Sequence, residues 1–140
     1  MQSLAGEAMS EFQIESSDTE ATLLFSGIRG DYFTVALSSG PVNARRDVWA
    51  YTDAHGLADL FEWMALQSKP WSGTEGWESL EGEFNIYASC CALGAVTFDI
   101  EMSHLGIVEE WRVTSRIKSE FGQLPSLATK ARSFFGPSPS

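Results

Sequence analysis

The sequence predicts an α+β fold, mostly antiparallel sheet of about seven strands with one central and one C-terminal helix, in the order ββββαβββα. Seven short runs alternate apolar with polar residues and are separated by Gly, Ser, Asp and Pro, which is typical of antiparallel strands joined by turns. Two other segments place apolar residues three and four positions apart, the spacing of an amphipathic helix. Because single helices separate the strand runs, this order favours α+β over alternating βαβ units.

The chain is predicted to form one domain over residues 10–136, with residues 1–9 as a loose extension and residues 137–140 as a disordered tail. A length of 140 residues suits a single domain that buries most of its apolar surface. The hydrophobic fraction of 44% is that of a globular protein. We find no internal repeat, low-complexity tract or linker that would divide the chain.

The first four strands are predicted within residues 11–51. Phe12 and Ile14 alternate with polar residues, and Leu23 and Phe25 share one face of the next run. Two more runs follow, bounded by the turn sequences IRGD and SSGP. Consecutive short runs joined by such turns predict an antiparallel meander.

A helix is predicted from Asp53, as its N-cap, to about Ser68. Lys69-Pro70 ends it because the residue before a proline avoids the helical region. A second helix is predicted to begin at about Pro125, a favoured first-turn residue, and to end at Gly136. The apolar stripe of the first helix holds Leu57, Leu60, Phe61, Met64 and Ala65, and that of the second holds Leu124, Leu127, Ala128, Ala131, Phe134 and Phe135.

Three strands are predicted between the helices, the last two joined by a hairpin turn near residues 104–109. One of these two strands carries an acidic row on its polar face, and the other carries a basic row. Opposite charges on neighbouring strands favour a register in which the rows face each other. We therefore expect one face of this sheet to be exposed to solvent and the other to be packed. The acidic row holds Thr97, Asp99, Glu101 and Ser103, and the basic row holds Arg112, Thr114, Arg116, Lys118 and Glu120.

The net charge of −10 bears on the class of partner. Nucleic acids and anionic membranes both reward a basic surface, so neither is expected to bind this chain. A basic protein would be attracted by the acidic field and would associate faster for it. High negative charge also keeps proteins soluble, and this simpler explanation stays open.

The two cysteines and the N-terminus indicate a cytoplasmic protein. Cys90 and Cys91 are adjacent in a predicted strand, so their side chains point to opposite faces and lack the spacing of a zinc site or a loop-closing disulfide. Reduced thiols are typical of the cytosol. The N-terminal residues have no basic region followed by an apolar core, so no signal peptide is predicted, and no run is long enough to span a membrane.

We predict no catalytic residue, cofactor or metal. The sequence has no G-x-S-x-G elbow and no glycine-rich phosphate loop, and the glutamates of residues 69–84 do not follow the spacing of a calcium-binding loop. His55, with Asp53 and Asp59 close by in sequence, is the strongest acid–base candidate, since a His and an Asp four residues apart can share a helix face. As an alternative function, Asp53, His55 and Glu81 would line a small-molecule or enzymatic pocket between the sheet and the first helix.

The segment KPWSGTEGWESLEGEF, residues 69–84, concentrates aromatic and acidic side chains. We interpret it as the crossover from the first helix to the later strands, with its tryptophans folded together as a small core. The alternative is an exposed aromatic surface ringed by carboxylates, which suits a basic protein partner. The candidate partner-binding residues are Trp63, Trp71, Glu75, Trp77, Glu78 and Glu81.

The segments VWAYTDAHGLADLFEWMA and WESLEGEF, followed by paired strands and a closing helix, resemble an uncharacterised family of small actinobacterial proteins over roughly residues 10–135. The layout is similar, more distantly, to Wap-type immunity proteins, which neutralise a co-encoded toxin of contact-dependent bacterial competition. The resemblance implies no catalytic residues. The family pattern falls on Trp49, Tyr51, Asp53, Leu57, Leu60, Phe61, Trp77, Ser79, Leu80, Glu81 and Gly82.

We therefore expect a non-enzymatic acidic binding protein, an immunity-type inhibitor that binds a basic toxin or another protein partner. The charge, the acidic and aromatic central segment and the absence of catalytic spacing support this expectation. A homodimer joined through a sheet edge is a further alternative.

Overall fold

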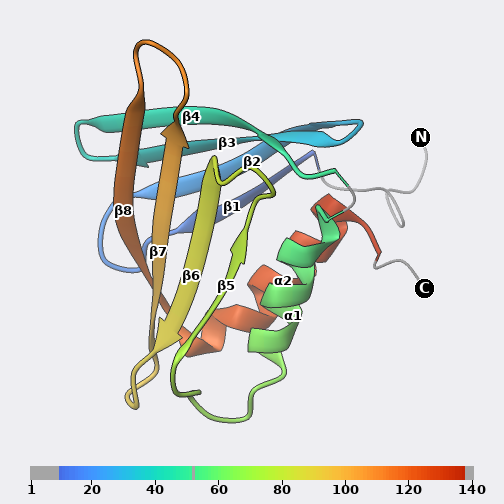
Figure 1. Ribbon diagram of the computed structural model, residues 1–140. Helices are drawn as coiled ribbons and strands as arrows, with labels where there is room; N and C mark the ends of the chain where they lie inside the picture. The colour runs from blue at the N-terminus through green and yellow to red at the C-terminus, as the bar shows by residue number, and fades with distance from the viewer. Residues whose placement is uncertain (1–9, 52, 138–140) are drawn as a thin grey trace, which may run out of the picture.

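The computed structural model describes residues 10–51 and 53–137 and confirms an α+β fold (Figure 1). The predicted N-terminal extension and all of the predicted tail except Pro137 lie outside the described residues. The elements are β1 (Glu11–Glu15), β2 (Thr22–Arg29), β3 (Tyr32–Ser39), β4 (Val42–Trp49), α1 (His55–Ala65), β5 (Thr74–Glu78), β6 (Phe84–Cys90), β7 (Ala95–His104), β8 (Trp111–Glu120), a 3₁₀ turn (Phe121–Gln123) and α2 (Leu124–Phe135).

The strands form two four-stranded antiparallel sheets, in the orders β1-β2-β3-β4 and β5-β6-β7-β8. The observed order is therefore ββββαββββα, one strand more than the sequence predicts. The additional strand is β5, which lies inside the segment that we interpreted as a crossover. It escapes the pattern analysis because it is only five residues long and Trp77 is its single buried residue.

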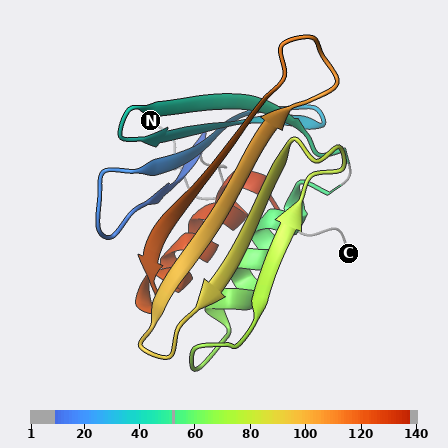
Figure 2. The ribbon, with the colours of Figure 1, turned by 60° about the vertical axis from the view of Figure 1, so that its left-hand side comes forward.

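The core lies between the inner faces of the two sheets and the two helices, which pack against each other behind β5–β8 (Figures 1 and 2). Phenylalanines from both halves of the chain meet there. The rings of Phe12 and Phe25 stack at 5.2 Å, and Phe135 lies edge-on to Phe33 at 5.3 Å. Because the two halves cover each other's apolar faces, the chain has one shared core.

Helix α1 confirms the predicted apolar stripe but not the predicted cap. Leu57, Phe61 and Met64 are fully buried, and the helix ends at Ala65, three residues earlier than expected. The Asp53 side chain makes no capping hydrogen bond, because its carboxylate accepts the indole N–H of a tryptophan instead. A distant aromatic donor thus replaces the local backbone donors that the sequence suggests.

Helix α2 begins at Leu124 with Pro125 in its first turn, and its predicted stripe is buried except for the partly exposed Phe135. It is tied to α1 through Arg132, which bonds to the carboxylates of Asp59 and Glu62. The Arg132 side chain is largely buried, so these bonds orient the two helices relative to each other.

The register of β7 and β8 confirms the predicted pairing of acidic and basic rows. Thr97 lies opposite Lys118 and Asp99 opposite Arg116, with an ion pair of 2.6 Å between the last two. The connecting hairpin spans the residues between His104 and Trp111 and extends beyond the rest of the sheet (Figures 1 and 2). Among the described residues, neither helix has the length and apolar character that a membrane crossing needs.

Candidate functional site

The tryptophans of residues 69–84 face inward. Trp71 and Trp77 are only 8% and 6% exposed, so both belong to the core. Trp77 packs against Phe33 of the other sheet at 6.3 Å, and Trp71 lies edge-on to Trp63 at 5.5 Å. Trp71 and Trp77 therefore belong to a small aromatic core, as we interpreted this segment, and they are inaccessible to a partner.

The other four candidate residues are exposed but do not form one surface. Trp63 is 37% exposed on α1. Glu78 lies on the outer face of β5, whereas Glu75 lies opposite the inward-facing Ala88 and so belongs to the other side of the same strand. Glu81 lies in the β5–β6 turn. The structure thus places these four residues on different faces of α1, β5 and the β5–β6 turn.

The sequence S-L-E-G-E, residues 79–83, forms the turn between β5 and β6. The backbone N–H of Ser79 donates to the carbonyl of Phe84, and the N–H of Gly82 donates to the carbonyl of Ser79. Gly82 has a φ of 75°, a left-handed conformation that glycine adopts without strain. The motif is therefore a tight hairpin connection.

Glu83, at the end of this turn, links the two sheets. Its carboxylate is buried and accepts the hydroxyl proton of Ser79 and, at 3.0 Å, the backbone N–H of Trp49 at the end of β4. Its carbonyl accepts the N–H of Ser103 on β7. These donors satisfy the buried carboxylate, which thereby joins the two sheets.

The three residues proposed for an alternative pocket are not gathered in one hollow. The Asp53 carboxylate accepts the indole N–H of Trp77 at 3.0 Å, and His55 is the first residue of α1. Glu81 lines a hollow of about 280 Å³ that neither of the other two residues lines. The geometry therefore assigns Asp53 a structural role and gives His55 no carboxylate partner from this set.

The outer face of the second sheet carries a different acidic surface. Cross-strand pairing places Glu78, Asn85 and Glu101 in one row, and it places Tyr87 opposite Asp99 in the next. Side chains two apart on a strand share a face, so these five side chains lie on one side of β5–β7. We call this surface the acidic face, defined by Glu78, Asn85, Tyr87, Asp99 and Glu101.

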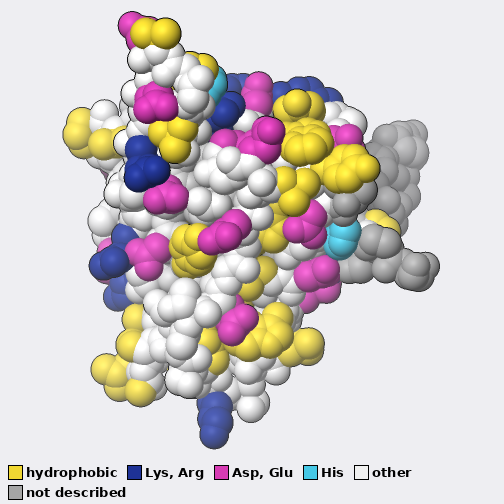
Figure 3. All heavy atoms as spheres, viewed as in Figure 1, with side chains coloured by type: hydrophobic (Ala, Val, Ile, Leu, Met, Phe, Trp, Pro, Cys, Tyr) yellow, Lys and Arg dark blue, Asp and Glu magenta, His cyan; other side chains and the backbone are white. Residues whose placement is uncertain are grey.

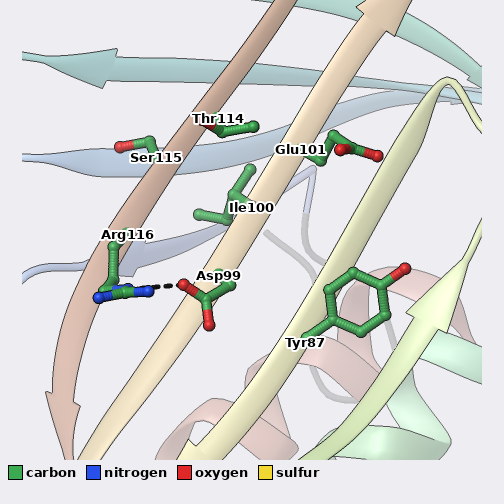
Figure 4. Close-up of a pocket in the computed structure, with 7 residues that line it drawn as sticks. All are labelled: Tyr87, Asp99, Ile100, Glu101, Thr114, Ser115 and Arg116. Atoms are coloured by element: carbon green, nitrogen blue, oxygen red, sulfur yellow. Dashed lines mark hydrogen bonds and ion pairs between the residues drawn. The ribbon is translucent and has the colours of Figure 1, made fainter.

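A shallow hollow of about 410 Å³ lies on the acidic face and continues onto β8 (Figure 4). Figure 4 shows Tyr87, Asp99 and Glu101 projecting from neighbouring strands, with Arg116 bonded to Asp99. The Tyr87 ring also covers Gly76, where any side chain would collide with it. Because Gly76 has no side chain, the tyrosine ring can pack directly on the backbone of β5.

Tyr87 is held by its acidic neighbours. Its hydroxyl donates a hydrogen bond to the Glu78 carboxylate. This bond, together with partial burial and the charges of Glu78 and Glu101, raises the pKa of Tyr87 to about 12. Tyr87 is therefore a neutral hydrogen-bond donor at physiological pH, and its ring remains a neutral π surface.

Two carboxylates of the acidic face lack a compensating cation. Asp99 pairs with Arg116, and Lys118 on β8 pairs with Asp18. In contrast, the described part of the chain offers Glu78 and Glu101 no salt bridge, and their bonds go to Tyr87 and the Asn85 amide. Figure 3 shows carboxylates spread over β5–β7 and basic side chains along β8. The uncompensated charge therefore lies around Tyr87.

The Asn85 side chain is the buried member of the acidic face. It is 7% exposed and donates to Glu101 at 2.9 Å, whereas its carbonyl oxygen is buried without a donor among the described residues. Such orphan acceptors are rare in folded proteins. Its position in the row between Glu78 and Glu101 puts an unsatisfied acceptor beside the two uncompensated carboxylates.

Sequence reasoning singled out Glu78 and the acidic row of β7 but missed the site that they form. The signal for Tyr87 was its place on the polar side of an alternating strand. Its neighbour Glu78 becomes visible only when the β5–β6 pairing is known, and β5 was not predicted. Within the described residues, no group of three or more His, Cys, Asp or Glu side chains has the geometry to hold a metal ion.

Comparison with known proteins identifies a family but no characterised relative. No curated protein and no solved structure matches the chain. A family of unknown function, DUF6228, matches residues 14–138, which reach from β1 through α2. Since this match covers most of the sequence, the chain belongs to the DUF6228 family.

Proposed function

We propose that the chain is a non-enzymatic, cytoplasmic binding protein that recognises a cationic surface of a protein partner through the acidic face. The observation that carries the proposal is the pair Glu78 and Glu101, which lie around Tyr87 without a salt bridge in the described structure. Glu78 is exposed and Glu101 is partly exposed. A guanidinium or ammonium group placed there would meet two carboxylates and an aromatic ring.

The net charge supports the same class of partner. A charge of −10 accelerates association with a basic protein and disfavours nucleic acids. The hollow is shallow and open, which suits a side chain presented on a protein surface better than an engulfed small ligand. The free cysteines support a reducing compartment.

A titration with a defined cationic probe tests the proposal. We expect a tetra-arginine peptide to shift the backbone NMR signals of β5–β7 in the isotope-labelled full chain. A tetra-glutamine peptide should not do so. Because the attraction is between exposed charges, the affinity should fall steeply as sodium chloride rises from about 20 to about 200 mM.

A matched pair of double variants locates the site. Glu78→Gln with Glu101→Gln should weaken peptide binding at least about fivefold, because both uncompensated carboxylates are lost. Glu11→Gln with Glu15→Gln removes the same two charges from exposed positions on β1 and should leave the affinity nearly unchanged. Equal losses in the two double variants would show that only net charge attracts the peptide, and would refute the proposed site.

An immunity-type inhibitor of a basic toxin is the biological form of this function that we favour. The layout resembles Wap-type immunity proteins, and inhibitors of that kind work by binding rather than by catalysis. The product of the adjacent gene is the first partner to test, by co-purification and by rescue of growth on co-expression. If the folded product of the adjacent gene neither binds the chain nor is neutralised by it, the immunity function is refuted.

A further inference from the structure

We propose that the tip of the β7–β8 hairpin is an apolar anchor that inserts into a hydrophobic pocket with a cationic rim on the protein partner. We call Leu105, Ile107 and Val108 the hairpin tip. The inference rests on the proposed function in one respect: the partner that covers the acidic face is taken to cover the tip as well.

The hairpin tip exposes aliphatic surface that the fold does not use. Val108 is fully exposed, and Leu105 and Ile107 are about half exposed. Turns of this kind usually carry Gly, Asn, Asp or Ser, each for a conformational reason, and here only Gly106, with a φ of 83°, has such a role. Single exposed apolar residues are ordinary, whereas three within four positions form a patch.

The hairpin also projects beyond the rest of the molecule (Figures 1 and 2). A projecting tip can enter a concave pocket that a flat sheet face cannot reach. Leu105 also borders two hollows of about 280 and 390 Å³ at the hairpin base. Side chains of a partner's pocket rim can therefore settle beside the base while the tip is buried.

Charge identifies the kind of pocket. Glu109 and Glu110 follow the tip directly and are exposed, and the Glu110 carboxylate also accepts the backbone N–H of Gly106 within the hairpin. Basic residues at the rim of the pocket would pair with them, whereas an anionic lipid surface would repel them. A second copy of the chain is disfavoured as the occupant, because each copy carries a charge of −10.

The hairpin tip and the acidic face are connected by β7, which carries Asp99 and Glu101 and leads directly into the hairpin. Glu101 and Leu105 are four residues apart along β7 and its continuation, a span of about 13 Å at the usual rise of a strand. A single protein surface readily covers that distance. The anchor and the charged contact therefore suit one partner, with the tip giving binding energy and the acidic face giving orientation.

The test uses the full chain with a photoreactive benzoylphenylalanine in place of Val108, expressed in the cells that naturally produce the protein. The control carries the same group in place of Leu93, which is almost fully exposed at the β6–β7 turn, at the other end of the sheet. We expect one protein adduct from position 108 and none from position 93. Equal adducts from both positions, an adduct with a second copy, or no protein adduct would overturn the inference.

The captured protein is then purified and its affinity is measured. Ile107→Asn with Val108→Asn should weaken binding at least about tenfold, because the buried anchor is lost, whereas Leu93→Asn should stay within about twofold of wild type. Circular dichroism and thermal unfolding should show the fold intact, since these side chains are exposed. Unchanged affinity in the tip variant, or binding of the wild type to vesicles of anionic phospholipid through the tip, would refute the anchor.

One additional variant separates this inference from the proposed function. Glu78→Gln with Glu101→Gln removes the charged contact and leaves the hairpin tip untouched. If only this variant weakens binding, the acidic face stands and the anchor fails. If only the tip variant weakens binding, the anchor stands and the proposed role of the acidic face fails.

Discussion

The Glu83 carboxylate joins the end of β4 to the β5–β6 turn. Glu83→Ala would leave the backbone N–H of Trp49 and the hydroxyl of Ser79 without their acceptor. We expect the free energy of unfolding to fall by about 2–3 kcal/mol, the cost of unsatisfied buried donors. Urea denaturation measures the free energy of unfolding. Glu83→Gln should lower it by less than Glu83→Ala, because glutamine keeps one acceptor oxygen.

Its neighbour Glu81 provides the control for this prediction. Glu81 is exposed in the same turn, so Glu81→Ala should change the free energy of unfolding by no more than about 0.5 kcal/mol. Comparable losses in the two alanine variants would mean that the turn tolerates neither change. The hydrogen bonds of Glu83 between the sheets would then add nothing specific to the free energy of unfolding.

Tyr87 gives a spectroscopic test of the acidic face. Its pKa is raised to about 12, first by the hydrogen bond to Glu78. The folded state therefore holds the phenolic proton more tightly than the unfolded state, whose tyrosine pKa is about 10. The resulting stabilisation is complete below pH 10 and is lost as the pH rises from about 10 to about 12.

Ultraviolet absorbance of the tyrosinate follows this titration. We expect one of the three tyrosines to titrate near pH 12 in the folded wild type and to move towards 10 in Glu78→Gln. The variant Tyr87→Phe should lose the late step altogether. A late step that persists in Tyr87→Phe would assign it to another tyrosine and argue against the hydrogen bond.

At the scale of elements, the first turn of α1 depends on a glycine. A Cβ at Gly56 would lie 2.7 Å from the Asp53 carboxylate and 2.8 Å from the Trp77 indole nitrogen. Gly→Ala in a helix normally stabilises it by about 0.5–1 kcal/mol. Here we expect Gly56→Ala to reverse that sign and lower the free energy of unfolding by about 1–2 kcal/mol, because both partners of the hydrogen bond must move.

Gly122 is the matched control for this substitution. It lies in the short 3₁₀ turn before α2, and an added Cβ there would have no atom within 4 Å. Thermal unfolding should show Gly122→Ala unchanged or slightly stabilised. If Gly56→Ala were also stabilising, the packing of α1 on Trp77 would be looser than the structure shows.

At the scale of the whole molecule, the chain repeats the order of four strands and a helix, yet the two halves share one core. Phe12 of β1 meets Phe135 of α2, and Arg132 of α2 bonds to Glu62 of α1. Each sheet alone would therefore expose its packed face to water. We predict that neither half folds by itself.

Expression of residues 1–68 and 69–140 as separate chains tests this prediction. Each fragment alone should give a disordered circular dichroism spectrum and poorly dispersed NMR signals. An equimolar mixture should recover the spectrum of the intact chain. A well-dispersed spectrum from either fragment would show that a half-molecule is an independent domain.

Local periodicity predicted most of the fold. The stripe of Leu57, Phe61 and Met64 requires a helix, and the alternation around Phe84 and Phe98 requires strands, because these spacings repeat over enough residues to exclude the alternative. The position of Asp99 opposite Arg116 could also be predicted, since the acidic and basic rows and a single hairpin turn define the register of the two strands. These features depend on residues close in sequence or joined by a single turn.

The remaining features depend on contacts between distant residues. Asp53 was expected to cap α1, yet it accepts the indole N–H of Trp77, 24 positions away. Strand β5 forms because it pairs with the edge of β6. Its single buried residue, Trp77, gives no alternating pattern from which the strand could be predicted. The acidic face likewise requires the pairing of β5, β6 and β7, so its members could not be grouped from their own segments.

The sequence by itself therefore determined the fold class, the amphipathic helices and the acidic character that favours a basic partner. Only the tertiary structure decided that Trp71 and Trp77 point inward, that Glu83 ties the sheets together, and that uncompensated charge gathers around Tyr87. The physical reason is that periodicity and net charge are local or additive properties. Burial and pairing are set by which distant surfaces meet in the folded chain.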